Sequence, residues 1–200
     1  MCCCARVGKA AEPPKWIKPQ LTRVTDGAPV GDDWLHEIKY DGYRMHARLD
    51  RGKIQLLTRT GHDWCKLHTV EVLRSVPVNT AYLISTASCA RCVLTGYPPS
   101  AACRPRWMRG RTDELTLFVF DLLFLDGEST AHLPLTERKE RLQRLFPKEI
   151  DGLRYSDHFP GDGPRFRKQA CSMGMEGVTS KRVDRPYVPV TVGSESSPSV

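Results

Sequence analysis

Residues 36–44 read HEIKYDGYR and place Lys39 among charged and aromatic side chains, directly before Asp41-Gly42. An Asp-Gly pair between two alternating stretches is typical of a tight β-hairpin turn. The stretches that alternate with the two-residue period of a strand are 34–40, 43–49 and 54–59. The sequence therefore predicts an antiparallel meander whose first turn follows Lys39.

Lys39 is either a surface cation beside this turn or a nucleophile, and the choice decides the function. A lysine attacks only as the neutral amine, whereas its unperturbed pKa is about 10.4. Nearby cations or a bound metal ion lower a lysine pKa, and Arg44 and Lys181 are the candidates for that effect. Glu37 shares the strand face of Lys39, and a carboxylate raises the pKa of a neighbouring lysine. We therefore expect Glu37 to turn toward a ligand instead.

The properties of the whole chain fit one globular domain with tails. The chain has 200 residues, of which 40% are hydrophobic, and its formal net charge is +7. This length can bury a core, and the basic balance permits an anionic partner without requiring one. No apolar run approaches the roughly 20 residues that span a bilayer, and the first residues lack the apolar core of a signal peptide. We therefore expect a cytoplasmic protein with no membrane partner.

The eight cysteines do not build a complete site in the sequence. Cys89 and Cys92 have the spacing of a metal-binding pair, and Cys103 is a candidate third ligand. Because no fourth ligand stands out nearby, we do not predict a structural zinc ion. Without a signal peptide, the even number of cysteines does not predict disulfides either.

The remaining periodicities predict an α+β domain with antiparallel strands and a few helices. The predicted elements are one or two buried strands over 115–127, a short strand over 176–182, and helices over 63–76, 134–146 and 163–173. Thr136 is the expected cap of the middle helix, and Gly174 can close the last one.

Three segments lack such periodicity. Residues 1–28 are rich in Cys, Pro and Lys, and they predict an irregular lead-in before a domain over 29–187. Inside that domain, residues 84–112 are rich in Ser, Cys, Arg and Pro and are expected to be disordered. Residues 188–200 are expected to form a disordered tail.

Residues 39–44, KYDGYR, resemble the KxDGxR motif of the nucleotidyltransferase family of ATP-dependent DNA ligases and mRNA capping enzymes. Further stretches resemble the ligase domain of the bacterial end-joining protein ligase D: LTRTG at 57–61, FVFDLLFLDG at 118–127, PLTERKERL at 134–142, LRYSDH at 153–158 and EGVTSKR at 176–182. The chain is identified as a member of this family over about residues 29–83 and 115–187.

The resemblance implies an ATP-grasp-like nucleotidyltransferase fold with antiparallel sheets and flanking helices. It also implies that Lys39 attacks the α-phosphate of ATP and releases pyrophosphate, which leaves AMP on the lysine. The AMP then passes to the 5′-phosphate of a DNA nick, and the neighbouring 3′-hydroxyl displaces it to seal the strand. The family uses a divalent metal ion, magnesium or manganese, to neutralise phosphate charge.

The resemblance assigns roles to residues of the first three predicted strands. Lys39 is the catalytic nucleophile. Glu37 and the backbone of Ile38 are expected near the adenine. Arg44 and Arg59 are expected to contact ribose and phosphate.

Three further residues follow later in the chain. Phe120 resembles the aromatic residue that stacks on adenine, and the alternative is a core phenylalanine in a buried strand. Glu176 resembles the carboxylate linked to the metal ion. Lys181 is expected to approach a phosphate, and the alternative is an exposed strand lysine. Together with Glu37, Ile38, Arg44 and Arg59, they make up the expected ATP site.

Two motifs of the family are missing from this chain. An LDGE-like motif, whose glutamate helps to hold ribose and metal, is replaced by YLISTA at 82–87. A Trp-x-Lys-x-Lys motif, whose lysines grip the α-phosphate, should follow 176–182, but the chain continues as YVPVTVGSESSPSV at 187–200. We also expect the OB-fold domain of the family to be missing. We hypothesise that frame changes in the coding DNA produced both odd segments, which resequencing of the gene would test.

The sequence therefore predicts a truncated adenylation domain of an ATP-dependent DNA ligase, with impaired activity, from DNA repair and recombination. Its expected partners are ATP, a divalent metal ion, nicked or broken double-stranded DNA and other end-joining proteins, and we expect a nucleoid-associated monomer. The alternatives are a non-catalytic nucleotide- or DNA-binding fragment and a gene remnant that scarcely folds. A capping enzyme is the enzymatic alternative, which a preference for GTP over ATP would reveal.

Overall fold

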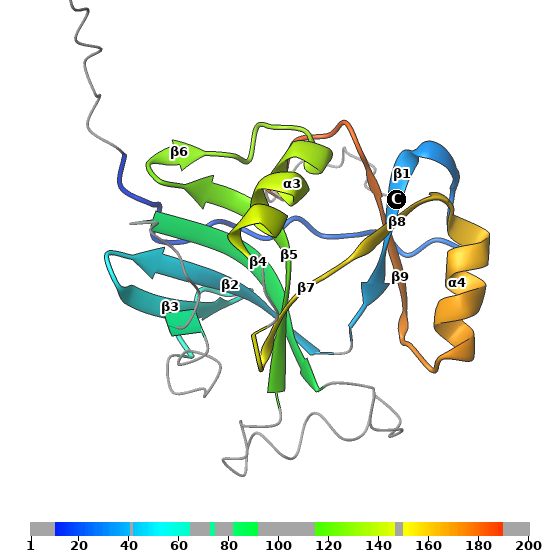
Figure 1. The fold of residues 1–200 in the computed structure, drawn as a ribbon, viewed down its shortest axis with the longest axis horizontal. Coiled ribbons are helices and arrows are strands. Elements are labelled where there is room, and N and C mark those ends of the chain that lie inside the picture. The colour runs from blue at the N-terminus through cyan, green and yellow to red at the C-terminus, as the bar shows by residue number, and fades with distance from the viewer. Residues whose placement is uncertain are drawn as a thin grey trace, which may run out of the picture.

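The computed structural model describes residues 11–40, 42–64, 73–74, 82–91, 115–146 and 150–189. In these residues, two largely antiparallel sheets are accompanied by the helices α3 (Leu135–Leu145) and α4 (Gly163–Ser172), which confirms the predicted α+β class (Figure 1). Neither helix combines the length and the apolar character needed to cross a membrane.

The larger sheet carries most of the apolar core. It has six strands: five follow the order β3-β2-β4-β5-β6, and the sixth, β7, pairs in parallel with β5. The strands are β2 (Gly42–Asp50), β3 (Lys53–Thr58), β4 (Tyr82–Arg91), β5 (Leu115–Leu125), β6 (Glu128–Ser129) and β7 (Leu153–Tyr155). The strand predicted over 43–49 is confirmed as part of β2, and its residues Met45 and Ala47 face the core, where they pack with Leu117, Val119 and Leu122 of β5.

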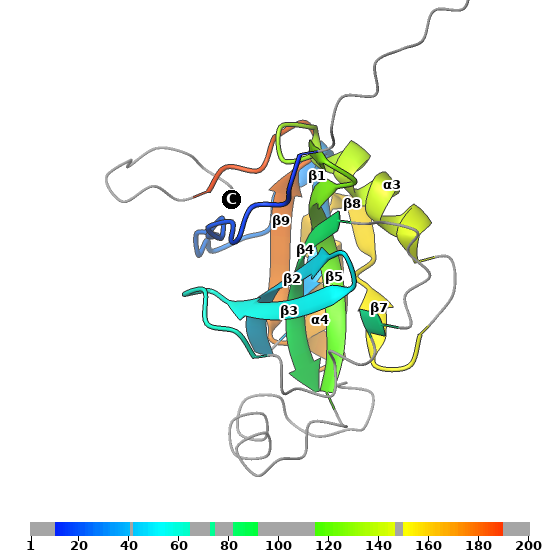
Figure 2. The ribbon, with the colours of Figure 1, turned by 90° about the vertical axis from the view of Figure 1, so that its left-hand side faces the viewer.

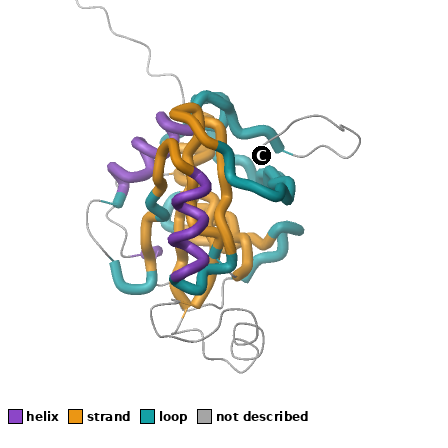
Figure 3. The backbone as a smooth tube through the Cα atoms, turned by 90° about the vertical axis from the view of Figure 1, so that its right-hand side faces the viewer, coloured by secondary structure: helices purple, strands orange, loops and turns teal. Residues whose placement is uncertain are grey.

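The smaller sheet holds three strands in the order β8-β1-β9. They are β1 (Val30–Lys39), β8 (His158–Asp162) and β9 (Gly177–Arg182). Helix α4 packs against all three strands and covers one face of this sheet (Figure 3). The sheet therefore pairs the first described strand with the last two.

The predicted hairpin at Asp41-Gly42 is wrong. β1 and β2 belong to different sheets, because β1 pairs with β8 and β9 whereas β2 pairs with β3 and β4. Burial explains the difference: Leu35, His36 and Glu37 are all buried, so both faces of β1 are covered. The chain thus crosses from one sheet to the other directly after Lys39, and Asp41 itself lies outside the described residues.

The structure also differs from the expectation of disorder over 84–112, because residues 84–91 belong to β4. This strand lies between β2 and β5 and pairs with both along its length. Its two neighbours supply partners for its backbone groups, so pairing does not require side chains that alternate between polar and apolar. Residues 92–112 lie outside the described part of the chain, and so does most of the helix predicted over 63–76.

The two later helices form where the sequence predicts them. Helix α3 begins one residue before Thr136, and Pro134 occupies the cap position without a side-chain hydrogen bond, so the predicted role of Thr136 as the cap is wrong. In α4, the Asp162 carboxylate accepts a hydrogen bond from the Arg165 backbone N–H. Gly174 follows α4 with a φ of +71°, a left-handed conformation that glycine adopts without strain.

Part of the lead-in packs against the domain. Pro13 and Pro19 are buried, and the Arg48 guanidinium donates to the carbonyl oxygens of Pro13 and Pro14 at 3.3 and 3.1 Å. Further along, the Gln20 backbone N–H donates to the hydroxyl of Tyr187 at 2.8 Å. Figure 2 shows the two ends of the described chain running beside each other. Part of the lead-in thus contacts the domain, whereas residues 21–27 are exposed, and the boundary after residue 28 stays a prediction.

Candidate functional site

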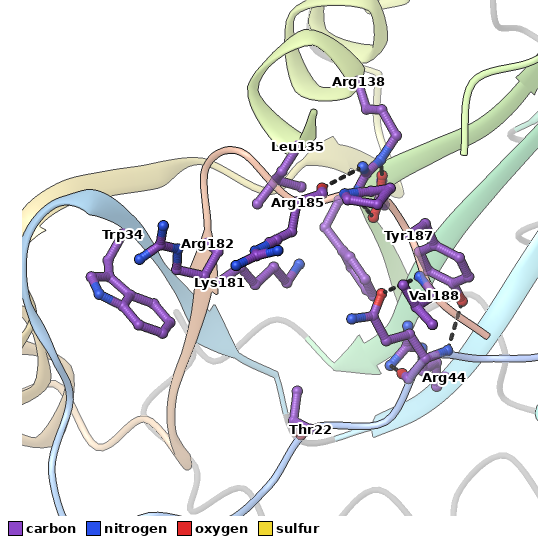
Figure 4. Close-up of a pocket in the computed structure, with 14 residues that line it drawn as sticks. Thr22, Trp34, Arg44, Leu135, Arg138, Lys181, Arg182, Arg185, Tyr187 and Val188 are labelled. Atoms are coloured by element: carbon purple, nitrogen blue, oxygen red, sulfur yellow. Dashed lines mark hydrogen bonds and ion pairs between the residues drawn. The ribbon is translucent and has the colours of Figure 1, made fainter. Parts of the chain in front are cut away.

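A pocket of about 400 Å³ lies where the two sheets, the start of α3 and the two ends of the described chain meet (Figure 4). Its walls carry a concentration of positive charge. The cationic lining residues are Arg44, Arg138, Lys181, Arg182 and Arg185. The aromatic rings of Trp34, Phe120 and Tyr187 also line it. Cations and aromatic rings together suit a ligand that combines a flat ring with negative charge.

Three residues of the predicted ATP site meet in this pocket from distant parts of the chain. Arg44 comes from β2, Phe120 from β5 and Lys181 from β9. β2 and β5 belong to the larger sheet and β9 to the smaller one, so only the packing of the two sheets brings the three side chains together.

A β-bulge in β5 places two consecutive residues, Phe120 and Asp121, on the pocket side of the strand. Thr86 pairs with Asp121 and Ala87 pairs with Val119, which leaves Phe120 as the extra residue of β5. A bulge inserts one unpaired residue and redirects its side chain. The consecutive residues Phe120 and Asp121 can therefore both line the pocket, while Val119 and Leu122 on either side of them point into the apolar core.

Two cations lie over the Phe120 ring. The Lys181 Nζ atom is 4.4 Å and the Arg44 Cζ atom is 5.4 Å from the ring centroid, distances at which a cation is attracted to the ring face. Phe120 is half-buried, so its side chain is neither fully enclosed in the core nor fully exposed to solvent. Its stacking on adenine stays a prediction.

The buried carboxylate of Glu37 lies between two lysines. Its oxygens are 2.6 Å from the Lys181 Nζ atom and 2.8 Å from the Lys139 Nζ atom. Lys139 is 1% exposed and also donates to the Ser156 carbonyl oxygen at 3.2 Å. Two positive charges and one negative charge are thus held together beside the pocket.

Burial and ion pairing shift the pKa values of Glu37, Lys139 and Lys181 in opposite directions. Burial alone would raise the pKa of Glu37, but the ammonium groups of Lys181 and Lys139 outweigh it and hold that pKa below its usual value. Burial would lower the pKa of Lys139, but the Glu37 carboxylate raises it instead. For Lys181, burial dominates and lowers the pKa.

A second buried pair forms the floor of the pocket near α3. The Arg138 guanidinium donates to both oxygens of Asp121, at 2.7 and 3.1 Å. It also donates to the carbonyl oxygens of Leu133 and Arg185, at 2.6 and 3.1 Å. Arg138 therefore connects β5, the approach to α3 and the segment that follows β9.

Lys39 lies at the end of β1, outside the lining of this pocket. Its ammonium group is paired with the Glu176 carboxylate, and 53% of its side chain is exposed. Across the strand pair, Lys39 faces Gly177, which has no side chain to crowd it. Arg44 and Lys181, the cations expected to influence this lysine, are engaged elsewhere: Arg44 donates to the Gln20 carbonyl oxygen, and Lys181 pairs with Glu37.

The two remaining predicted residues also lie outside the pocket lining. Ile38 is half-buried and pairs with Val178 of β9. Arg59 is exposed in the turn after β3. The roles proposed for these residues and for Lys39, Glu37 and Glu176 stay predictions.

Arg138 and Lys139 are the site residues that the sequence reasoning missed. The stretch 134–142 predicts a helix and carries part of the family resemblance, but neither observation assigns a role to Arg138 or Lys139. At helical spacing, however, Arg138 and Lys139 fall on the same face as Leu135 and Leu142, the face that the structure buries. Two cations on a buried helix face need partners, and this pattern could have pointed to Glu37.

His46 lies next to Arg44 on β2 and is 1% exposed. Neither of its ring nitrogens has a hydrogen-bond partner among the described residues. Burial, assisted by the positive charge of Arg44, lowers the pKa of His46 to about 4. The ring is therefore neutral at physiological pH.

The described residues contain no cluster of three or more His, Cys, Asp or Glu side chains that could hold a metal ion. Glu176, the predicted metal-linked carboxylate, is paired with Lys39. Of the cysteines with metal-ligand spacing, Cys92 and Cys103 lie outside the described part of the chain.

The sequence and fold are similar to those of DNA ligases. A family model of the ATP dependent DNA ligase domain matches residues 106–195. The multifunctional non-homologous end joining protein LigD of Pseudomonas aeruginosa is 33% identical over 179 residues, which cover 87% of this chain and 21% of that protein. DNA ligase 1 of Korarchaeum cryptofilum is 38% identical over 191 residues, which cover 86% of this chain and 34% of that protein.

Solved structures show the same fold. A mycobacterial DNA ligase D complexed with ATP and MES superposes with a TM-score of 0.73 at 26% identity, over 86% of this chain and 56% of that chain. The ligase domain of LigD from M. tuberculosis gives a TM-score of 0.72 at 26% identity, over 86% of this chain and 55% of that chain.

The matched span is informative in two ways. A match over 87% of this chain can omit only its ends, so it includes residues 36–44. The family model begins inside the odd segment 84–112 and runs into the C-terminal tail, to residue 195. The chain nevertheless spans only about a fifth to a third of the length of the two curated relatives.

Proposed function

Because this chain is homologous to the ligase domain of ATP-dependent DNA ligases, we propose that it binds ATP in the pocket between its sheets and transfers AMP to Lys39. The convergence of Arg44, Phe120 and Lys181 on one cationic pocket supports nucleotide binding most directly. All three were assigned to ATP from the sequence, and they come from strands of both sheets.

Different parts of the nucleotide would contact the Phe120 ring and the cations of the pocket. The adenine would lie against Phe120, which requires the cations of Arg44 and Lys181 to move off the face of that ring. Their charge would then be available to the phosphates. Glu37 would act through Lys181, because the ion pair fixes where that ammonium group can lie.

The chemical step would form a bond between the Lys39 Nζ atom and the α-phosphorus and break the bond to pyrophosphate. Only the neutral amine can attack, so Lys39 would first have to give up its proton and its ion pair with Glu176. Breaking the ion pair is inexpensive because both side chains are exposed, and exposed ion pairs contribute about 0–1 kcal/mol.

A divalent metal ion would neutralise charge on the phosphates during this transfer. The described residues do not form a metal site from protein ligands alone. Magnesium in nucleotide sites is commonly held by one or two carboxylates together with the phosphates, and Glu176 fits that partial role. We assign no further step to the metal.

Strand sealing on nicked or broken DNA would be the wider activity of a protein that contains this domain. The net charge of +7 favours a polyanionic partner, and such a partner would place the protein at the nucleoid, with other end-joining proteins nearby. We propose a monomer in which the missing lysines and carboxylate slow adenylation by orders of magnitude, since each electrostatic contact to a reacting phosphate contributes several kcal/mol.

One observation favours a second candidate, a non-catalytic nucleotide- or DNA-binding module. Lys39 is paired with Glu176 and lies outside the pocket lining. Such a module would bind DNA with a strong dependence on salt but would not become labelled at Lys39.

The test is covalent labelling with ATP that carries a radioactive α-phosphate, in the presence of magnesium, followed by a denaturing gel. Lys39→Ala is the decisive variant, and Lys53→Ala, which removes an exposed lysine from β3, is the matched control. We expect label on the wild type and on Lys53→Ala, and none on Lys39→Ala. Folded wild-type protein that binds ATP without becoming labelled would favour the non-catalytic module instead.

A further inference from the structure

We propose that Arg185 is a phosphate-binding residue at the mouth of the pocket, and that Asp184 holds its affinity down by competing for positive charge. This inference rests on the proposed nucleotide site and assigns a contact to the outer phosphates of the ligand.

The backbone of Arg185 is fixed against the pocket floor. Its carbonyl oxygen accepts a hydrogen bond from Arg138, which is itself held by both oxygens of Asp121. Two residues later, the Tyr187 backbone N–H donates to the Ala131 carbonyl oxygen at 2.7 Å. A side chain that starts from a fixed backbone loses less freedom when it binds a ligand.

The side chain of Arg185, in contrast, is largely uncommitted. It is 69% exposed, and its one ion pair among the described residues is with Asp184, at 3.8 Å from its Nε atom. That distance is too long for a hydrogen bond. Arg185 lines the pocket, so its donors lie within reach of a bound molecule.

The other cations of the pocket are already engaged. Lys181 is paired with Glu37, and the guanidinium of Arg44 donates to the Gln20 carbonyl oxygen at 2.7 Å. Arg182 donates to both oxygens of Asp184, at 3.1 and 3.3 Å, and lies over the ring of Trp34. Arg185 is thus the lining cation that makes no side-chain hydrogen bond within the described chain.

The chemistry of the group suits a phosphate. A guanidinium presents paired donors that match two phosphate oxygens, and an arginine keeps its charge throughout the physiological range. The exposure of Arg185 suits the solvated outer phosphates better than the base. Arg185 would thus add a cation near the outer phosphates from the segment directly after the EGVTSKR stretch at 176–182.

Asp184 opposes this binding. The hydrogen bond from Arg182, together with the charges of Arg182 and Arg185, lowers the pKa of Asp184, so its carboxylate is charged at neutral pH. A carboxylate beside two cations that line the pocket both occupies Arg182 and repels an incoming phosphate. Its removal should therefore strengthen the binding of phosphate-rich ligands.

The test is calorimetric titration of the full chain with ATP and with AMP, at fixed low salt and with magnesium. We expect Arg185→Ala to weaken ATP binding about three- to tenfold and AMP binding less than about twofold. Asp184→Asn should tighten ATP binding about two- to fivefold. Arg165→Ala, which removes an exposed cation from α4, is the matched control and should change neither affinity.

Each other outcome has a definite meaning. Equal weakening of ATP and AMP by Arg185→Ala would overturn the phosphate contact and indicate a structural role of the segment. Unchanged ATP affinity in Arg185→Ala would overturn the inference while the proposed nucleotide site stands. A folded wild type that binds neither nucleotide would overturn the proposed function and this inference with it.

Discussion

The larger sheet buries mainly apolar side chains, whereas the smaller sheet buries mainly polar ones. In the larger sheet, Met45, Leu56, Leu117 and Leu122 are completely buried. In the smaller sheet, the buried side chains are Leu35, His36, Glu37 and Ser180. Apolar burial is non-directional and tolerates small shifts, but buried charges require specific partners. The larger sheet therefore supplies stability, and the smaller sheet presents chemistry that depends on exact pairing.

The largest expected effect tests this dependence on pairing. Glu37→Ala leaves the buried Lys139 and the largely buried Lys181 without their counter-ion, which should lower the free energy of unfolding by about 3–5 kcal/mol. Urea denaturation at pH 7 measures this loss. Because the folded pKa of Glu37 is lowered, its stabilisation is present above the unfolded pKa of about 4.3 and is lost as the pH falls through the folded value.

The matched control comes from the other sheet. Leu122→Ala creates an apolar cavity and should cost about 2–5 kcal/mol at any pH at which the protein folds. A Glu37→Ala loss below about 1 kcal/mol would contradict the importance of the buried ion pairs.

The next largest expected effect is a loss of stability in acid, caused by His46 in the larger sheet. In the unfolded chain, His46 binds a proton near its ordinary pKa of about 6.5, but in the folded protein it does so only at about 4. Stability should therefore fall by about 3 kcal/mol as the pH drops from 6.5 to 4. Unfolding curves across this range, compared with those of His46→Gln, measure the contribution.

His36 provides the comparison in the smaller sheet, because burial also lowers its pKa. Separate His46→Gln and His36→Gln variants assign the acid sensitivity to one sheet or the other. If His46→Gln keeps the full wild-type slope between pH 6.5 and 4, the buried neutral ring is not its origin.

A smaller effect is expected where α4 approaches β1. A Cβ atom at Gly163 would lie 2.3 Å from the Pro29 carbonyl oxygen and 2.7 Å from the His36 ring. Gly163→Ala should therefore cost about 1–3 kcal/mol, because backbone and a buried ring must move. Thermal melting measures this cost, and Gly27→Ala, where no atom lies within 4 Å, is the control. Equal melting temperatures for the two variants would show that the helix moves aside freely.

The smallest effect is expected on the exposed face of α3. Glu140 and Arg144 form an i, i+4 ion pair at 3.6 Å, with most of both side chains exposed. Glu140→Gln should change stability by less than about 0.5 kcal/mol, since water and salt screen such pairs. A loss comparable to that of Glu37→Ala would mean that burial is not what distinguishes the two pairs.

The sequence predicts the individual elements better than their assembly. The period of 43–49 identifies the core face of β2, and helical spacing locates α3 and α4. The Asp-Gly pair, however, also suits a chain that turns between two sheets, and no local signal tells this from a hairpin. The partners of β1 lie more than 100 residues away, so its membership of the smaller sheet depends on tertiary contacts.

For the site, too, the sequence predicts individual residues better than the contacts between them. The resemblance selects Arg44, Phe120 and Lys181, which the structure places around one pocket. It does not reveal that Lys139 neutralises Glu37, because that pairing depends on how α3 packs between the sheets. Nor does it reveal Gln20, whose backbone and side chain contact Arg44, Tyr187 and Val188 from a segment with no regular period.

The position of β1 has a consequence for the order in which the protein is made. Of the described strands, β1 leaves the ribosome first, yet its two partner strands, β8 and β9, are synthesised last. The β2–β3 hairpin can form early, while β1 must wait for β8 and β9 with both edges unpaired. A nascent chain stalled after α3 would therefore contain much of the larger sheet but neither the smaller sheet nor a complete pocket. Such a chain would present β1 as an open edge to chaperones or to other nascent chains.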